Sequence, residues 1–376
     1  MRRDRLETER YSRQIRFAPI GEAGQRKLCD AGVLIVGAGA LGASLAQHMV
    51  RSGVGFVRLV DRDYVEISNL HRQTLFDEED ARSALPKAVA AAAKLRRMNS
   101  GARIEALVAD VGLRNAESLL IGVDLALDGT DNAETRLLMS DACFAHGVPF
   151  VYGGVAGSGG MSAMLVPGKH VCLRCLLGEE AASDADGGAI TCDTIGVIAP
   201  AVELIAGLQA VEALKWLTGN VHALRDTWIS ADVWNLSLKE WKLPRPRESC
   251  VHCGSGHHLE RLNEAARVVP QARSIAWEVE RREQPLEEAQ AVVLCGRDTV
   301  QWTLRSTARL SEWEGRLSGR GCEITASNAY LIRALTAEGV RIVLFADGRS
   351  LIQGAGGIER AEQIYRSYLA EEEAPL

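Results

Sequence analysis

The sequence has no long apolar run and no excess of positive charge. Its 43 lysines and arginines are outnumbered by 49 aspartates and glutamates, a net charge of −6, so neither a nucleic acid nor an anionic membrane is expected as a partner. The longest apolar stretch, residues 31–46, is interrupted by glycines and ends at Gln47, whereas a membrane span needs about 20 apolar residues. The charged residues at the start are not followed by an apolar segment, so no secretory signal is expected. These features favour a cytoplasmic protein.

The nine cysteines are an odd number, and four of them form two closely spaced pairs. An odd count without an expected signal peptide argues against a disulfide framework. Cys172 and Cys175 form one Cys-x-x-Cys motif, and Cys250 and Cys253 form another. Two such motifs supply the four thiolates of a tetrahedral zinc site, which would be structural because no position is left open. A redox dithiol is the alternative.

The pattern of apolar segments predicts strands that alternate with helices. With 376 residues, of which 47% are hydrophobic and 24% charged, the chain is long enough for two globular domains. Strands are expected at 32–36, 57–60, 104–108 and 149–152, and residues 119–127 are expected to lead into a further strand that ends at 128–132. Helices are expected at about 41–53, 86–99, 133–146 and 197–218. This alternation predicts an α/β fold with a Rossmann-like, mainly parallel sheet and flanking helices. Residues 153–160 are expected to be a flexible loop, and residues 178–191 a mobile crossover segment.

A second, smaller α/β domain is expected after the proline-containing stretch at 244–247. We place the domains at residues 1–255 and 256–376, with strands of the second near 291–295 and 340–345. No internal repeat is evident.

A glycine-rich turn and an acidic residue predict a nucleotide site. Gly37-Ala-Gly-Ala-Leu-Gly42 follows the first strand, where the backbone at a helix N-terminus can approach phosphates. Asp61 stands 19 residues beyond Gly42, close to the ~20 expected for a carboxylate that hydrogen-bonds a ribose. The segment 128–132 ends another strand at the same edge of a parallel sheet, so these groups are expected to share one site. The alternative for Asp61 is a cap of the next segment.

The cationic residues distinguish ATP from a dinucleotide. Arg13, Arg72 and Lys87 can neutralise a triphosphate, since arginine and lysine stabilise the charge that develops during attack at phosphorus. Asn69 and Gln73 add neutral donors. Asp131 is a candidate ligand for Mg²⁺, which prefers carboxylate, water and phosphate oxygens.

Cys192 precedes a helix expected from 197. A helix N-terminus lowers the pKa of a thiol and favours a nucleophile, whereas a small buried residue near a turn needs no such role. Both interpretations stay open.

With these residues in place, the first ~255 positions resemble the ThiF/MoeB/HesA family, bacterial relatives of ubiquitin-activating enzymes. The matching segments, besides the two cysteine pairs, are Arg10-Tyr-Ser-Arg13-Gln-Ile15, Gly37 to Gly42, Asp61-x-Asp-x-Val-x-x-Ser-Asn-Leu-x-Arg-Gln73, Pro86-Lys87, Asp128-Gly-Thr-Asp-Asn132 and Cys192-x-Thr-x-Gly-Val197. The resemblance implies a homodimer that uses Mg-ATP to adenylylate the C-terminal glycine carboxylate of a small ubiquitin-like sulfur carrier of the ThiS/MoaD kind. The product would be an acyl-adenylate for sulfur transfer in thiamine or molybdopterin biosynthesis.

The resemblance also implies roles for single residues. Asp61 would bind ribose, Asn69, Arg72 and Lys87 the phosphates, and Asp131 magnesium or the reacting centre. Arg13 would reach into the partner subunit's site, and Cys192 would bond to the carrier during sulfur loading in ThiF-type members. The implied nucleotide-binding set is Gly37, Gly39, Ala40, Gly42, Asp61, Asp63, Ser68, Asn69, Leu70, His71, Arg72, Gln73, Lys87, Asp131 and Asn132.

The end of the chain, from Val340 to Tyr368, looks like the C-terminal extension of some ThiF-type proteins, and its role is open. No rhodanese domain is apparent, so a separate sulfur donor is expected. One alternative is adenylylation of the C-terminus of a ribosomally made peptide in antibiotic biosynthesis. An NAD-dependent oxidoreductase and a non-catalytic scaffold are further alternatives, but the sequence offers no hydride-transfer acid or base, and the retained site residues disfavour a scaffold.

Overall fold

The computed structural model describes residues 9–178, 195–254, 292–294, 299–303 and 308–370. The chain divides into two compact units, one made of residues 1–77 and 86–275, the other of 78–85 and 276–376. The expected boundary between 255 and 256 and the expected crossover segment at 178–191 lie largely outside the described residues. Those two expectations therefore stay predictions.

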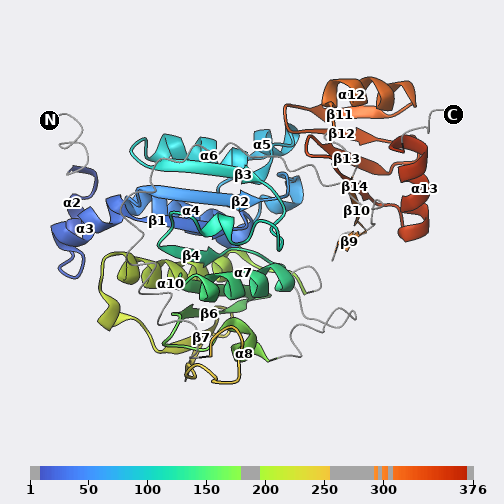
Figure 1. Ribbon diagram of the computed structural model, residues 1–376. Helices are drawn as coiled ribbons and strands as arrows, with labels where there is room; N and C mark the ends of the chain where they lie inside the picture. The colour runs from blue at the N-terminus through green and yellow to red at the C-terminus, as the bar shows by residue number, and fades with distance from the viewer. Residues whose placement is uncertain (1–8, 179–194, 255–291, 295–298, 304–307, 371–376) are drawn as a thin grey trace. The chain divides into compact units, whose positions relative to one another are not determined.

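An eight-stranded sheet forms the centre of the first unit, in the order β3-β2-β1-β4-β5-β6-β7-β8 (Figure 1). The first five strands in that order pair in parallel, and β6, β7 and β8 continue the sheet in antiparallel fashion. The strands are β1 (Gly32–Val36), β2 (Phe56–Asp61), β3 (Arg103–Val108), β4 (Leu125–Asp128), β5 (Phe150–Ala156), β6 (Gly159–Leu165), β7 (Thr227–Asp232) and β8 (Ser237–Lys242). The predicted mainly parallel α/β sheet is confirmed.

Helices cover both faces of this sheet (Figure 1). On one face α4 (Ala40–Ser52) packs beside α6 (Lys87–Met98) and α10 (Ala199–Leu217). On the other, α7 (Ala133–Ala145) and α8 (Leu173–Leu177) lie over a core that includes Leu34, Phe144 and Phe150. Strand β1 is buried along its whole length, as expected for a parallel strand covered on both sides.

The expected flexible loop at 153–160 is wrong, because these residues form the ends of β5 and β6 and the turn between them. The strand glycines of this hairpin are needed because neighbouring atoms lie where a Cβ would stand. A Cβ built on Gly153 would lie 2.3 Å from Gln209, and one on Gly160 would lie 2.4 Å from the Gly154 carbonyl oxygen. A glycine inside a strand often marks such a close approach of neighbouring atoms rather than mobility. Strands β6, β7 and β8 were not predicted.

The second unit contains a six-stranded antiparallel sheet in the order β11-β12-β13-β14-β10-β9. Its helices α12 (Leu310–Gly319) and α13 (Ile358–Tyr368) bury Trp313, Leu317 and Ile364 in one core with Trp302 of the sheet. The strands are β9 (Val292–Leu294), β10 (Thr299–Thr303), β11 (Glu323–Ser327), β12 (Leu331–Leu335), β13 (Arg341–Phe345) and β14 (Arg349–Gln353). Strands β9 and β13 lie where the sequence predicted them.

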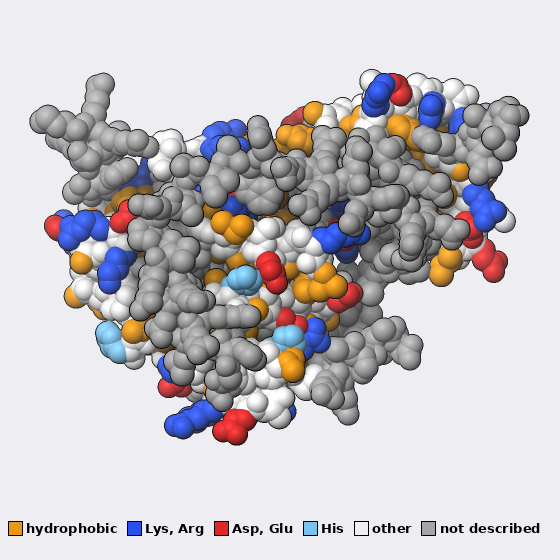
Figure 2. All heavy atoms as spheres, in the orientation of Figure 1, with side chains coloured by type: hydrophobic (Ala, Val, Ile, Leu, Met, Phe, Trp, Pro, Cys, Tyr) orange, Lys and Arg blue, Asp and Glu red, His pale blue; other side chains and the backbone are white. Residues whose placement is uncertain are grey.

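On the face drawn in Figure 2, lysines and arginines lie among aspartates and glutamates. Every helix in the described ranges is too short or too polar to cross a membrane.

Candidate active site and metal centre

The glycine turn after β1 touches the end of β4. Gly37 has a φ of +87°, and a Cβ built on it would lie 2.7 Å from the carbonyl oxygen of Gly129. A Cβ on Gly42 would lie 1.8 Å from the carbonyl oxygen of Gly37. Neither position accepts a side chain, so the two strand ends meet at backbone distance. Helix α4 begins after Gly39 without a side-chain cap, which leaves backbone N–H groups available to an anion.

Asp61, at the end of β2, ties this turn to the next strand end. One carboxylate oxygen accepts a hydrogen bond from the Ala38 N–H (2.6 Å), and the other accepts one from the Asp63 N–H (2.7 Å). Burial raises the pKa of Asp61, whereas the charge of Lys87 and these two N–H groups oppose the shift. A carboxylate has about four lone-pair sites, so acceptor capacity remains for a sugar hydroxyl.

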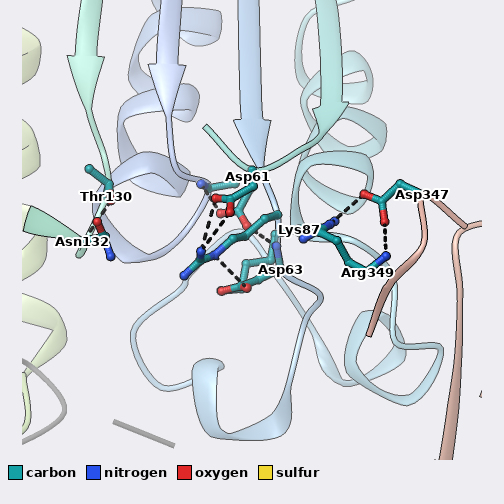
Figure 3. Close-up of polar contacts among 10 residues, drawn as sticks. Asp61, Asp63, Lys87, Thr130, Asn132, Asp347 and Arg349 are labelled. Atoms are coloured by element: carbon teal, nitrogen blue, oxygen red, sulfur yellow. Dashed lines mark hydrogen bonds and ion pairs between the residues drawn. The ribbon is translucent and has the colours of Figure 1, made fainter. Parts of the chain in front are cut away.

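Lys87 and Asp63 form a salt bridge beside Asp61 (Figure 3). The Lys87 Nζ lies 3.1 Å from the Asp63 Oδ2, and the Lys87 N–H donates to the Asp63 carbonyl oxygen at 2.8 Å. The lysine side chain is 4% exposed and the aspartate 33%. A buried ammonium needs such a carboxylate, and the partly exposed Asp63 leaves that ammonium near the strand ends.

The segment from 66 to 73 folds around Asn69. Its side chain is buried, and its Oδ1 accepts the Glu66 N–H at 3.2 Å in a reciprocal capping box at the start of η1 (Ile67–Asn69). The backbone oxygen of Ser68 accepts a hydrogen bond from Arg72 Nη1 at 3.1 Å and lies 3.1 Å from His71 Nδ1. These contacts give the segment a defined shape. They engage Asn69 and Arg72 locally, and their predicted contacts to phosphate stay predictions.

Gln73 faces the glycine turn. A Cβ built on Gly39 would find its nearest neighbour, Gln73 Nε2, at 3.8 Å. The Gln73 side chain is buried, and within the described residues its Oε1 has no hydrogen-bond partner. A buried polar atom without a partner points to a group that the site receives.

The end of β4 carries Asp131 and Asn132 (Figure 3 shows the latter). Asp131 is exposed. Asn132 caps α7, since its Oδ1 accepts the Thr135 N–H at 2.8 Å, and its own N–H donates to Thr130 Oγ1 at 2.9 Å. The structure therefore gives Asn132 a capping position and leaves Asp131 accessible.

A buried ion pair beneath this loop was missed from the sequence. Arg136 Nε lies 2.6 Å from Asp128 Oδ2, and its Nη2 donates to the carbonyl oxygens of Thr130 (2.6 Å) and Gly153 (3.1 Å). Burial raises the pKa of Asp128, and Arg136 opposes that shift. The pair fixes the backbone that presents Asp131. The available signal was an aspartate at a strand end followed by an arginine in the first turn of the next helix.

Arg62 is a second missed cation. Its Nη1 lies 3.2 Å from Asp110 Oδ1. Desolvation would lower the pKa of Arg62, but the charges of Asp110, Asp63 and Asp131 outweigh it, so its pKa is raised. Arg62 therefore stays charged within reach of two predicted site residues.

Arg13 lies away from these groups within one chain. It is exposed on α2 (Ser12–Ile15), and the neighbouring Gln14 Nε2 donates to the Ser52 carbonyl oxygen at 2.9 Å. Ser52 ends α4, whereas the glycine turn lies at its start. A helix of this length spans about 20 Å, so the structure does not bring Arg13 to the strand ends. Cys192 lies outside the described residues.

The four cysteines of the two motifs converge. Their sulfur atoms all lie within 4.8 Å of one another, and the Cys172–Cys250 and Cys175–Cys253 pairs are each separated by 3.8 Å. Four thiolates at about 2.3 Å from a tetrahedral Zn²⁺ would stand about 3.8 Å apart. The geometry fits a closed four-thiolate metal site.

Asp141 of α7 contacts both motifs. Its Oδ2 lies 2.6 Å from Arg174 Nε, and its Oδ1 lies 3.6 Å from His252 Nδ1. Arg174 and His252 lie inside the first and second Cys-x-x-Cys motifs respectively. Asp141 thus links both motifs to α7 beside the cysteines.

Comparison with known proteins agrees with this arrangement. The profile of the ThiF family matches residues 11–252. The sulfur carrier protein ThiS adenylyltransferase of Bacillus subtilis is 40% identical over 96% of this chain and 99% of its own length. The sulfur carrier protein adenylyltransferase of Thermus thermophilus is 36% identical over 68% of this chain and 93% of its own. The crystal structure of Escherichia coli MccB has a TM-score of 0.56 at 21% identity, over 65% of this chain and 72% of that one, which shows a shared fold.

Proposed function

Because this chain belongs to the ThiF family, we propose that it adenylylates the C-terminal carboxylate of a small ubiquitin-like sulfur carrier protein. The observation that carries this conclusion is the 40% identity to a ThiS adenylyltransferase over nearly the whole of both chains. The strand-end site supports the chemistry, because it combines a glycine turn, a ribose-type carboxylate and cations at one edge of the sheet.

The carrier carboxylate attacks the α-phosphorus of ATP. A bond forms between a carboxylate oxygen and that phosphorus, and the bond from the α-phosphorus to the bridging oxygen breaks, giving an acyl-adenylate and pyrophosphate. A carboxylate is already ionised at neutral pH, so no side-chain base is needed. Catalysis rests on positioning and on neutralising charge.

The residues around the glycine turn supply these two effects. The open N–H groups at the start of α4 and the Lys87 ammonium face the triphosphate, with Asn69, Arg72 and Gln73 as further donors. The Asp61 carboxylate accepts a hydrogen bond from a ribose hydroxyl. Arg136 and Asp128 hold the loop that presents Asp131.

Asp131 would hold Mg²⁺. Its carboxylate is exposed at the strand ends rather than enclosed by other acidic groups. This fits Mg²⁺, which is commonly bound by one or two carboxylates together with substrate phosphates and water. The ion would neutralise phosphate charge.

Arg13 would act in a partner subunit of a homodimer. Its position near the far end of α4 keeps it from the site of its own chain. A two-fold interface exchanges the same surface between subunits, so each Arg13 can serve the other site.

Zinc is the metal that the four cysteines would hold, as a structural ion. Cys192 is proposed to bond to the carrier, which would receive sulfur from a separate donor. Thiamine biosynthesis is the favoured pathway over molybdopterin biosynthesis, since the relative matched over nearly its full length is a ThiS adenylyltransferase. The cytoplasmic location expected from composition stays a prediction.

Carrier-dependent exchange of pyrophosphate into ATP tests the function. Wild-type protein is expected to catalyse exchange with a ThiS-like carrier, and Arg72→Ala and Asp131→Ala are expected to lose it while staying folded. Arg26→Ala is the matched control, because Arg26 pairs only with exposed Glu22 among the contacts described. Full exchange in both site variants would overturn the assigned roles.

The same assay separates the peptide alternative. The likeness to MccB, at 21% identity, shows the fold alone. Exchange with a short peptide and none with any carrier ending in Gly-Gly would favour that alternative.

A further inference from the structure

Residues 78–85 interrupt the first unit and fold as part of the second. The chain belongs to the first unit up to Asp77 and again from Pro86. This excursion separates Arg72 from Lys87, two cations that the proposed function assigns to the same triphosphate. The conformation of residues 78–85 therefore affects where the Lys87 side chain lies.

The excursion ends in a strained turn. After α5 (Glu78–Arg82), the Leu85 N–H donates to the Asp80 carbonyl oxygen at 3.0 Å and the Ala84 N–H to that of Ala81 at 3.3 Å. This pair of bonds defines a Schellman motif, whose left-handed position usually holds glycine. Here it holds Ala84, with a φ of +47°. A residue with a Cβ is disfavoured in that conformation, so the turn needs outside support.

Two side chains of the C-terminal sheet supply that support. Asn328 Nδ2 donates to the carbonyl oxygen of Ser83 at 3.0 Å and lies 3.4 Å from that of Ala84. Arg333 donates from Nη1 to the Ala81 oxygen and from Nη2 to the Arg82 oxygen, each at 3.3 Å. The last carbonyl groups of a helix lack partners within the helix. Here two side chains donate to the four successive carbonyl groups of residues 81–84, of which that of Ala81 also accepts the Ala84 N–H.

Both donors are themselves fixed. Asn328 Oδ1 accepts the N–H groups of Tyr330 (2.8 Å) and Leu331 (3.0 Å) at the turn between β11 and β12. Arg333 Nε donates to Thr325 Oγ1 at 3.0 Å across the same pair of strands. The β11–β12 hairpin therefore presents a rigid set of donors to residues 81–84.

We propose that the C-terminal unit holds residues 78–85 through Asn328 and Arg333 and thereby positions Lys87 for ATP. The inference rests on the proposed function, and both residues are positioning residues. Only Leu85 and Pro86 separate the held turn from Lys87. The Lys87 N–H is also bonded to the Asp63 carbonyl oxygen, so loss of the contacts to Asn328 and Arg333 would free the stretch on its other side. Part of its ordering would then fall to ATP binding, which raises the cost of binding.

Asn328→Asp in the full-length protein tests the hold. Aspartate keeps the acceptor that Tyr330 and Leu331 use but loses the donors to Ser83 and Ala84. We expect the KM for ATP in carrier-dependent exchange to rise about tenfold, the size expected for lost hydrogen bonds, with kcat changed less than about twofold. Amide hydrogen exchange at residues 78–87, measured without ATP, should accelerate.

Two controls separate positioning from damage to the unit. Gln353→Glu adds the same charge to the same sheet, beside Arg341, and should leave both readouts unchanged. Ala84→Gly, combined with Asn328→Asp, removes the left-handed strain and should restore most of the ATP affinity.

Unchanged KM and amide exchange in Asn328→Asp, with an active wild type, would overturn the positioning role and leave the proposed function standing. A raised KM that Ala84→Gly does not rescue would also count against it. If the wild type shows no carrier-dependent exchange, the proposed function fails, and amide exchange alone then decides whether Asn328 holds residues 78–85.

Discussion

Lys87 is a buried charge that forms a salt bridge with Asp63, and the Asp63 side chain is partly open to solvent. The Lys87 Nζ lies 3.1 Å from the Asp63 Oδ2. Because Asp63 is one-third exposed, it can accept water if the lysine turns toward a phosphate. The lysine side chain therefore lies near the strand ends before the nucleotide arrives.

Lys87→Met should remove this charge at little cost to the fold. We expect carrier-dependent exchange to fall at least about 100-fold, as when one preorganised charge stabiliser is lost. The melting temperature should change by only a few degrees, because Asp63 stays solvated. Lys94→Met on the same helix, where Lys94 pairs with exposed Asp77, should retain exchange. Normal exchange in Lys87→Met would remove Lys87 from the site.

At the scale of elements, the glycine turn combines two different demands. Gly37 and Gly42 are needed because backbone atoms lie where a Cβ would stand. Gly39 has a negative φ and open space around it, so under the proposed function its lack of a side chain would leave room for the phosphates.

Alanine at the two positions should therefore act differently. Gly39→Ala is expected to fold with a melting temperature near that of the wild type but to lose ATP affinity, because the methyl group would stand where phosphates approach. Gly42→Ala is expected to lower stability by several kcal/mol, as for a steric clash in a packed site. Calorimetry of folding and of ATP binding separates them. Equal loss of stability in both would contradict this division.

The cysteine motifs form a second element whose removal can be measured. One zinc ion per chain is expected by elemental analysis, and Cys172→Ser is expected to lose it and to aggregate on mild heating. Cys29→Ser, outside the cluster, serves as the control. Full metal content in Cys172→Ser would contradict a four-thiolate site.

Local sequence patterns predicted much of the fold and part of the candidate site. The strand at 32–36 and the turn after it could be predicted directly. A strand buried on both faces requires a continuous apolar run, and close contact between backbone segments requires glycine. The hairpin at 150–165 was misread because glycines that fit against Gln209 look the same as glycines of a loop. Asn328 could not be assigned, because its Nδ2 donates to backbone carbonyls, which carry no sequence signal. Arg136 was missed although its partner Asp128 stands at a strand end and Arg136 itself lies in the first turn of the next helix.

At the scale of the whole molecule, Arg13 sets a condition on assembly. If Arg13 acts across a two-fold interface, a mixture of Arg13→Ala and Lys87→Met subunits contains dimers with one intact site. After subunit exchange at equal amounts, about a quarter of wild-type activity should return. Each variant alone should be inactive. No recovery in mixed dimers, confirmed by mass, would place Arg13 in its own chain's site, whereas full activity of Arg13→Ala alone would place it outside the chemistry.

The sulfur atoms of Cys172 and Cys250 lie close together although 78 positions separate them along the chain. A metal ion bound there would act as a cross-link over α10, β7 and β8. In the denatured ensemble, closing a loop of that length removes entropy worth about 4–5 kcal/mol at 25 °C. Metal supply would then govern how readily newly made chains complete the antiparallel edge of their sheet, and zinc-starved cells would accumulate chains open at that edge.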